Sequence, residues 1–103
     1  MKKSFLIFLL LYSFNSTNSF SQLNMTLKGK LAYTSDLASV WGYAANGKEY
    51  ALVGAYGGLS IVDVTNPVAP VEVQFVTTQN SIWHEMKTWS HYAYVVNDEG
   101  GGM

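Results

Sequence analysis

The chain has 103 residues, with six basic side chains against seven acidic ones, and it contains no cysteine. A formal net charge of −1 and the lack of any arginine or basic cluster exclude a phosphate-neutralising surface, so we expect no nucleic-acid partner. Because no disulfide can form, the fold must be held together by packing alone.

Residues 1–21 have the layout of a secretory signal peptide. Two lysines follow the first methionine, an unbroken apolar run spans 5–12, and Ser19 and Ser21 supply the small residues at positions −3 and −1 of a cleavage site. The apolar run is shorter than the about 20 residues of a membrane-spanning helix. We therefore predict an exported protein, secreted or at the cell surface. Its mature chain would start at Gln22 with no membrane span and, with four basic and seven acidic side chains, a net charge near −3.

The mature chain is predicted to contain a leader or linker at 22–30 and a folded all-β region at 31–103 made of short strands. The segment 59–65 has apolar residues on both faces, as expected for a strand covered on both sides. The segment 71–75 alternates apolar and polar residues, which predicts a strand with one wet face. This grading from a buried to a half-buried strand is expected across a β-propeller blade.

Turn residues separate these strands. Gly57 and Gly58 lie between the apolar segments 50–56 and 59–65, where a two-residue hairpin turn needs positive φ. Asn66 and Pro67 then end the return strand, because proline cannot donate to a β-ladder.

An internal repeat organises the region. The Val-Trp pair at Trp41 recurs as Ile-Trp at Trp83, and the strand that begins at Tyr50 recurs at Tyr92. Both pairs have one offset, since 83 − 41 and 92 − 50 are both 42. A period of about 40 to 45 residues is typical of propeller blades, so we predict antiparallel four-stranded blade-like repeats of a β-propeller.

The second copy of the repeat stops where its buried strand should begin, at Met103. We therefore expect about one blade and part of a second, with the remaining blades of a longer protein as partners. Stacked repeats need about three copies or more for stability, so we also expect that this piece does not fold alone. A small complete sandwich is the alternative, but it would end on a hairpin tip that lacks a partner strand.

The stretch 52–67 resembles the LVIVD repeat of bacterial surface and secreted proteins, with Leu-Ser-Ile-Val-Asp-Val at 59–64 as its core. The ordered series of Val-Trp-Gly-Tyr at 40–43, this repeat, and Trp-His-Glu-Met-Lys at 83–87 resembles the choice-of-anchor B family. The resemblance covers 31–103. It implies a propeller-like array, export, and attachment through a variable C-terminal sorting element, and it implies no catalytic residue.

Few residues are candidates for chemistry. Asp63 is either an acid–base or metal carboxylate or, as we favour, an acceptor for backbone N–H groups in the following turn. His84 and Glu85 are adjacent, so on a strand they point to opposite faces and cannot form one site alone. His91 is predicted to be a solvated turn residue.

The segment 97–102 combines two carboxylates, Asp98 and Glu99, with three glycines. Flexible oxygen ligands of this kind suit Ca²⁺, which makes the two residues weak candidates for a calcium site. We favour the alternative of a solvated hairpin tip. No zinc, EF-hand or phosphate-loop spacing occurs, so no other cofactor is predicted.

The folded region is rich in aromatic residues, which could stack on a carbohydrate or peptide or could pack between blades. They are Trp41, Tyr43, Tyr56, Trp83, Trp89, Tyr92 and Tyr94. Repetition favours packing for the two repeat-related tryptophans.

No catalytic constellation is recognised, which predicts a binding or surface-display scaffold for a protein, peptide or glycan rather than an enzyme. The alternative is part of an exported hydrolase, with carboxylates converging at the propeller centre or a catalytic domain downstream.

Overall fold

The structure, a computed structural model of the chain, describes residues 24–100; the predicted signal peptide lies outside this part. The described residues form six β-strands and no helix, as expected for an all-β fold. The strands are β1 (Leu37–Ala45), β2 (Lys48–Ala55), β3 (Gly58–Asp63), β4 (Val71–Thr77), β5 (His84–Trp89) and β6 (Tyr92–Asn97). Over 24–100, therefore, no helix exists that would be long and apolar enough to cross a membrane.

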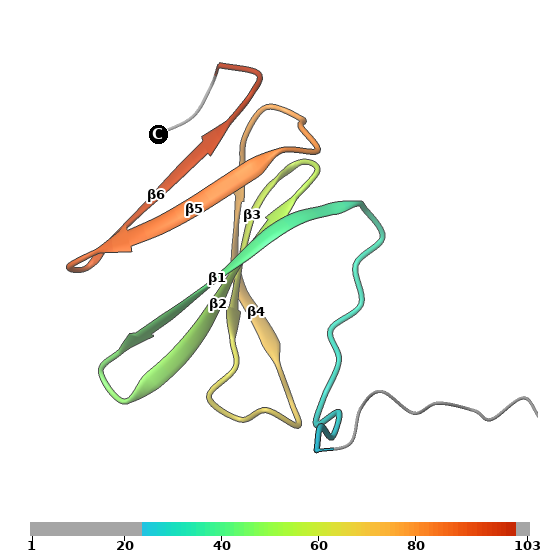
Figure 1. Ribbon diagram of the computed structural model, residues 1–103, viewed down its shortest axis with the longest axis vertical. Coiled ribbons are helices and arrows are strands. Elements are labelled where there is room, and N and C mark those ends of the chain that lie inside the picture. The colour runs from blue at the N-terminus through green and yellow to red at the C-terminus, as the bar shows by residue number, and fades with distance from the viewer. Residues whose placement is uncertain (1–23, 101–103) are drawn as a thin grey trace, which may run out of the picture.

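The first four strands form one antiparallel sheet in the order β1-β2-β3-β4 (Figure 1). Asn46 and Gly47 connect β1 to β2, and their φ angles of 53° and 72° are those of a type I′ hairpin turn. We did not predict this turn, although Asn-Gly is the strongest short-range hairpin signal that a sequence can carry.

The turn between β2 and β3 lies one residue earlier than predicted. Ala55 pairs with Gly58, so the two loop residues are Tyr56 and Gly57. Gly58 is the first residue of β3, at φ 155°, and a Cβ atom there would lie 2.1 Å from the carbonyl oxygen of Val76 on β4. Glycine is required at this position by the close approach of β4 as well as by the backbone angle.

Burial differs sharply between the last two strands of this sheet. Leu59, Ser60 and Val62 of β3 are buried and belong to both faces of the strand, as predicted. All seven residues of β4 are exposed, so the expectation of one wet face was wrong. The reason is that β4 is the last strand of the sheet, whereas β5 packs on β1 and β2, so neither face of β4 is covered among the described residues; a bulge at Val73 also shifts its register.

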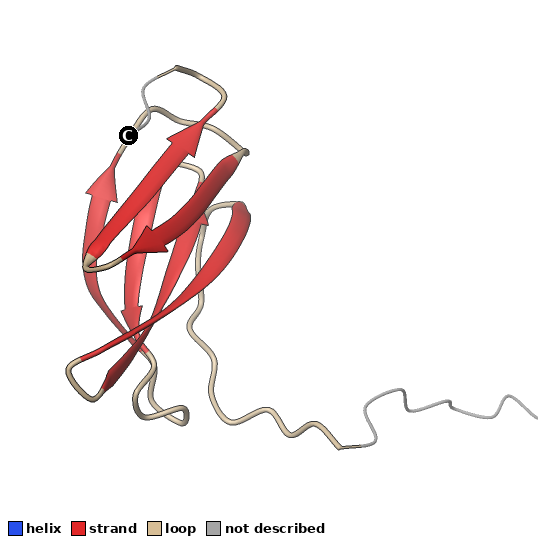
Figure 2. Cartoon of the chain, turned by 60° about the vertical axis from the view of Figure 1, so that its left-hand side comes forward, coloured by secondary structure: helices blue, strands red, loops and turns tan. Residues whose placement is uncertain are grey.

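The two strands β5 and β6 form a separate antiparallel hairpin that lies across one face of the first sheet (Figure 2). Met86 of β5 is 1% exposed and packs with Leu52 and Leu59 of the first sheet. Trp41 packs against the same cluster. We call this contact between the two sheets the seam, and it holds the main core of the described residues.

The segment before β1 follows the opposite face of the first sheet. The Tyr33 hydroxyl lies 2.9 Å from Oγ of Ser60, which in turn donates to the carboxylate of Glu72. Further back, Gly29 lies against the backbone of Pro67 and the ring of Pro70. The leader is therefore docked along the sheet as an irregular segment.

The predicted equivalence of Trp41 with Trp83 is wrong. Trp41 lies within β1, half-buried in the seam, whereas Trp83 precedes β5 and is 67% exposed. Tyr50 and Tyr92 are also not equivalent, since Tyr50 is the third residue of its strand and Tyr92 the first. The turns of the two hairpins start at Asn46 and Ser90, and 90 − 46 gives an offset of 44.

Pairing confirms this second offset. Trp41 pairs with Leu52 in the first hairpin, and the residues 44 positions later, Glu85 and Val96, pair in the second. The position of the turn sets the register of a hairpin. Residues 42 positions apart, although similar in type, therefore do not occupy equivalent positions in the two hairpins. What repeats is the stacked hairpin itself.

Candidate functional site

The seam is fixed by side chains that reach from β1 to β5. Nε1 of Trp41 donates a hydrogen bond to Oγ1 of Thr88 at 3.0 Å, and Nζ of Lys87 lies 4.0 Å from the centre of the Trp41 ring. Ser39 donates from its hydroxyl to the backbone carbonyl of His84. Trp41 is therefore a packing residue, as we favoured, with a polar and a cationic partner on the neighbouring sheet.

His84 enters the seam through a gap left by glycine. A Cβ atom on Gly54 would lie 2.7 Å from the Cβ of His84, so only glycine allows β5 this close to β2. His84 is 3% exposed, and its Nε2 lies 3.1 Å from the hydroxyl of Thr78. Its Nδ1 is buried and has no hydrogen-bond partner among the described residues.

Glu85 points away from the seam, where it forms an exposed ion pair of 2.8 Å with Lys87. His84 and Glu85 thus lie on opposite faces of β5, as expected of adjacent strand residues, although both line the hollows at the start of β5 described below.

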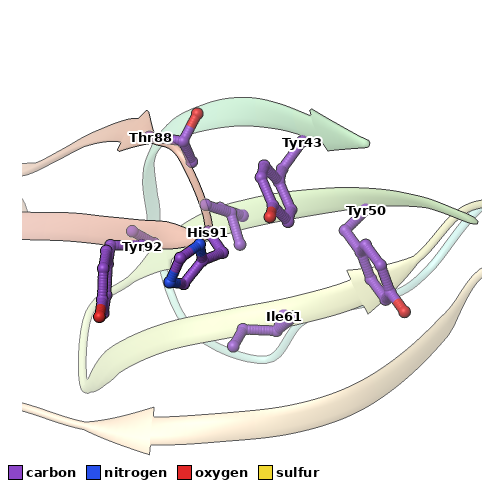
Figure 3. A pocket seen from close by; sticks show the side chains of 8 residues that line it. Tyr43, Tyr50, Ile61, Thr88, His91 and Tyr92 are labelled. Carbon is purple, nitrogen blue, oxygen red and sulfur yellow. The ribbon is translucent and has the colours of Figure 1, made fainter. Parts of the chain in front are cut away.

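A pocket of about 230 Å³ opens at the end of the seam near the two hairpin turns (Figure 3). The labelled lining residues are Tyr43, Tyr50, Ile61, Thr88, His91 and Tyr92. His91 is exposed in the turn Ser90-His91, as predicted, but it also forms part of this wall. The lining is mostly apolar and comes from both sheets, so the pocket is a gap in the packing between them.

The opposite end of the seam carries a rigid loop between β4 and β5. Ser81 is 4% exposed, its N–H donates to the carbonyl of Tyr56 at 2.9 Å, and its hydroxyl donates to the carboxylate of Asp98. The N–H of Trp83 donates back to Oγ of Ser81 at 2.9 Å. These bonds present Ile82 and Trp83 to solvent, at 56% and 67% exposed.

Trp83 lines two hollows. One, of about 510 Å³, includes Asp36 and Glu85 in its walls, and the other, of about 270 Å³, includes Glu85 and Asp98. His84 lines both. The sequence did not reveal this arrangement, because it joins the starts of β1 and β5 with the end of β6.

Asp63 acts as a turn acceptor, as predicted. Its carboxylate accepts the backbone N–H of Thr65 at 3.0 Å, and Lys48 lies 3.4 Å away. Hydrogen bonds from Thr65 are the main cause that holds the pKa of Asp63 below its usual value, with a smaller contribution from Lys48. Asn66, which follows Thr65 and precedes Pro67, accepts the N–H of Val68 with its side chain. The segment 63–68 therefore reverses the chain after β3.

The two calcium candidates are engaged differently. Asp98 is occupied by Ser81, and the backbone N–H of Glu99 donates to the side chain of Asn97 at 3.1 Å, as in a turn. Between residues 24 and 100 no three His, Asp or Glu side chains gather as metal ligands would. The calcium hypothesis therefore depends on Asp98 and Glu99 alone.

The outer face of the β5–β6 hairpin is aromatic and exposed. Trp89, Tyr92 and Tyr94 are 76%, 60% and 46% exposed, respectively. Trp89 and Tyr94 contrast with Trp41, which is used in the seam, whereas Tyr92 also lines the seam pocket and its ring centre lies 4.5 Å from that of His91.

Comparison with known families gives one match. Residues 39–78 match the model of the LVIVD repeat, and these residues include nearly all of the four-stranded sheet. No curated protein and no solved structure gives a significant match to the chain. Residues 39–78 are therefore similar to the LVIVD repeat, a β-propeller repeat, and a four-stranded antiparallel sheet with a two-stranded sheet stacked on it is the fold of an incomplete propeller-like repeat.

Proposed function

We propose that this protein, whose residues 39–78 are similar to the LVIVD repeat, is an exported binding or display scaffold of the choice-of-anchor B type. The signal-like segment at 1–21 supports export to the cell surface or medium. In this proposal the sheets stack as blades, and the loops at their ends bind a protein, peptide or glycan.

The observation that carries the proposal is the presentation of tryptophan at a rigid, solvent-exposed position. Trp83 is 67% exposed although its loop is tied down by Ser81, Asp98 and Tyr56. An exposed indole on a preorganised loop loses little conformational entropy on binding, and tryptophan is enriched among residues that dominate binding energy. No packing role within the described residues accounts for its position.

We interpret the seam pocket as a position for a further strand of the repeat array and not as a separate ligand site. The first sheet has four strands, whereas β5 and β6 pair only with each other among the described strands, leaving Tyr50 and Ile61 open beside β6. A third strand added to β6, equivalent to β3, would cover this gap. We propose that further blades of the same protein supply this strand and are its structural partners.

The test uses the exported protein, labelled at its N-terminal amine, on arrays of immobilised glycans and peptides, together with chromogenic glycosides and esters as hydrolase substrates. A scaffold is expected to show saturable binding to one ligand class and no turnover. Turnover that survives purification to homogeneity would favour the hydrolase alternative, and absence of binding to either array would contradict the scaffold role.

A further inference from the structure

We propose that Trp83 and the hollows beside it bind a cationic side chain, an arginine of a peptide segment, stacked on the exposed indole between carboxylates. The proposal rests on the scaffold function above, and it assigns that function a site and a class of ligand. The site lies at the end of the seam where β1 and β5 begin and β6 ends, the upper end of the molecule in Figure 1.

The charged side chains in the walls of the hollows at Trp83 are carboxylates, one of which, Glu85, is already paired with Lys87. Asp36 and Glu85 lie in the walls of the larger hollow, and Glu85 and Asp98 in those of the smaller one. Of the residues that the structure describes, no lysine lines either hollow; the nearest cation on β5, Lys87, is paired with Glu85 at 2.8 Å. A cation over the face of tryptophan gains about 0.5–2 kcal/mol, and adjacent carboxylates add to this attraction.

The geometry favours an organic cation over a metal ion. Within 24–100 the acidic side chains do not gather as three ligands around one point, which a bound Ca²⁺ would need. A planar guanidinium, in contrast, can stack on an indole while its N–H groups reach separate carboxylates. The larger hollow, about 510 Å³, has room for one such side chain and part of a peptide backbone.

The site is also built rather than accidental. The hydroxyl of Ser81 holds the Asp98 carboxylate, and the backbone N–H of Trp83 is bonded to the same hydroxyl. The loop is further fixed by Ser81 N–H on the Tyr56 carbonyl, while Tyr56 N–H donates to the Asp36 carbonyl at 3.0 Å. One hydrogen-bonded chain therefore fixes the backbone at Trp83 and Asp36 and the carboxylate of Asp98.

Buried His84 gives a second indication. It lines both hollows, and its Nδ1 has no partner among the described residues although the side chain is buried, at 3% exposed. An unpaired buried polar atom costs free energy, and such atoms are enriched where a ligand or water completes the site.

The experiment is an NMR titration of the full chain with the peptide acetyl-Gly-Arg-Gly-amide, observing the indole N–H signals of Trp41, Trp83 and Trp89. We expect the Trp83 signal to shift with a Kd on the order of 1 mM, while those of Trp41 and Trp89 stay in place. The matched probe acetyl-Gly-citrulline-Gly-amide, which has the same shape without the charge, should bind about tenfold more weakly. Added salt should weaken only the arginine probe.

Variants separate the indole from the carboxylates. Trp83→Ala should abolish binding, and Glu85→Gln with Asp36→Asn should weaken it about tenfold. Trp89→Ala removes a tryptophan that is 76% exposed, against 67% for Trp83, at the far end of β5, and it should leave binding unchanged. The signal of Trp41 reports whether each variant is folded. If a variant is unfolded, comparison of the arginine and citrulline probes on the unaltered chain still tests the arginine site.

A Trp83 signal that does not move, or moves equally with both probes, would overturn the arginine site. Binding of glycans or of other peptides on the arrays would then leave the scaffold function standing. If neither array binds the protein and the Trp83 signal does not move, both the scaffold function and the arginine site are contradicted.

Discussion

Trp41 and Thr88 are 47 residues apart in the chain and joined by a hydrogen bond of 3.0 Å across the seam. This bond ties the indole of the first sheet to the second, and Trp41 also packs against the buried cluster that includes Met86. Trp41 therefore both buries area and satisfies a polar group between the two sheets, which the Leu52–Leu59–Met86 cluster and the Ser39–His84 bond also join.

Trp41→Phe should loosen the second sheet without removing the ring from the seam. Loss of the bond leaves Thr88 without its donor and costs about 1 kcal/mol, which corresponds to about a fivefold fall in the protection of β6 amides. Hydrogen exchange followed by NMR measures this protection. Trp89→Phe, at a 76% exposed position, is the control, and equal protection in both variants would contradict the role of the bond.

Gly54→Ala should separate β5 from β2. The new methyl group would lie 2.7 Å from the Cβ of His84, a contact that forces the two strands apart at a cost of about 1–3 kcal/mol. Gly42→Ala is the matched control on the neighbouring strand, since a Cβ there meets no atom within 4 Å. Hydrogen exchange of β5 should rise in the first variant alone; unchanged exchange would mean that the seam is looser than described.

Asp63 should make the turn after β3 sensitive to acid. Because Thr65 and Lys48 lower its folded pKa, its stabilising effect is complete above the ordinary value of 3.8. The effect is lost as the pH falls below 3.8 through the lowered pKa. A carboxyl titration by NMR should find the Asp63 midpoint below this value.

Asp63→Asn keeps an oxygen that can accept the Thr65 N–H but removes the charge. The variant should lose the acid-dependent change in Thr65 amide exchange, whereas Glu99→Gln should retain it. A normal Asp63 midpoint would show that the turn bonds do not form in solution.

Tyr33→Phe should loosen the segment before β1 from the first sheet. The Tyr33 hydroxyl makes a hydrogen bond with Ser60 of β3, and its loss is worth about 1 kcal/mol, or about fivefold in local opening. Limited trypsin digestion at Lys30 should accelerate by this factor. Tyr43→Phe, whose hydroxyl is far from the leader, should cleave at the original rate; faster cleavage in both would point to general loosening.

Much of the first sheet could be predicted from local patterns. The apolar strand at 50–56, the doubly buried return strand and the turn role of Asp63 all depend on residues close in sequence. The turn at Tyr56-Gly57 was displaced by one residue because Gly58 is needed for the approach of Val76, a contact made by a different strand.

The arrangement of the second sheet could not be predicted in the same way. Aligning Trp41 with Trp83 followed residue similarity, but register is set by the turns, and Asn46-Gly47 was the signal that would have corrected the offset. The exposed Trp83 loop depends on hydrogen bonds from Ser81 to Asp98 and Tyr56, which are distant in sequence. Contacts between residues so distant in sequence produce no periodic pattern in the sequence from which they could be predicted.

The packing of β5–β6 on the first sheet is most directly tested by nuclear Overhauser contacts of the Trp41 indole in solution. The structure predicts contacts from this ring to the side chains of Met86 and Thr88, with slow exchange of the indole N–H. A Trp41 ring that contacts only its own sheet, with an indole N–H exchanging as fast as that of Trp89, would contradict the seam and the blade stacking inferred from it.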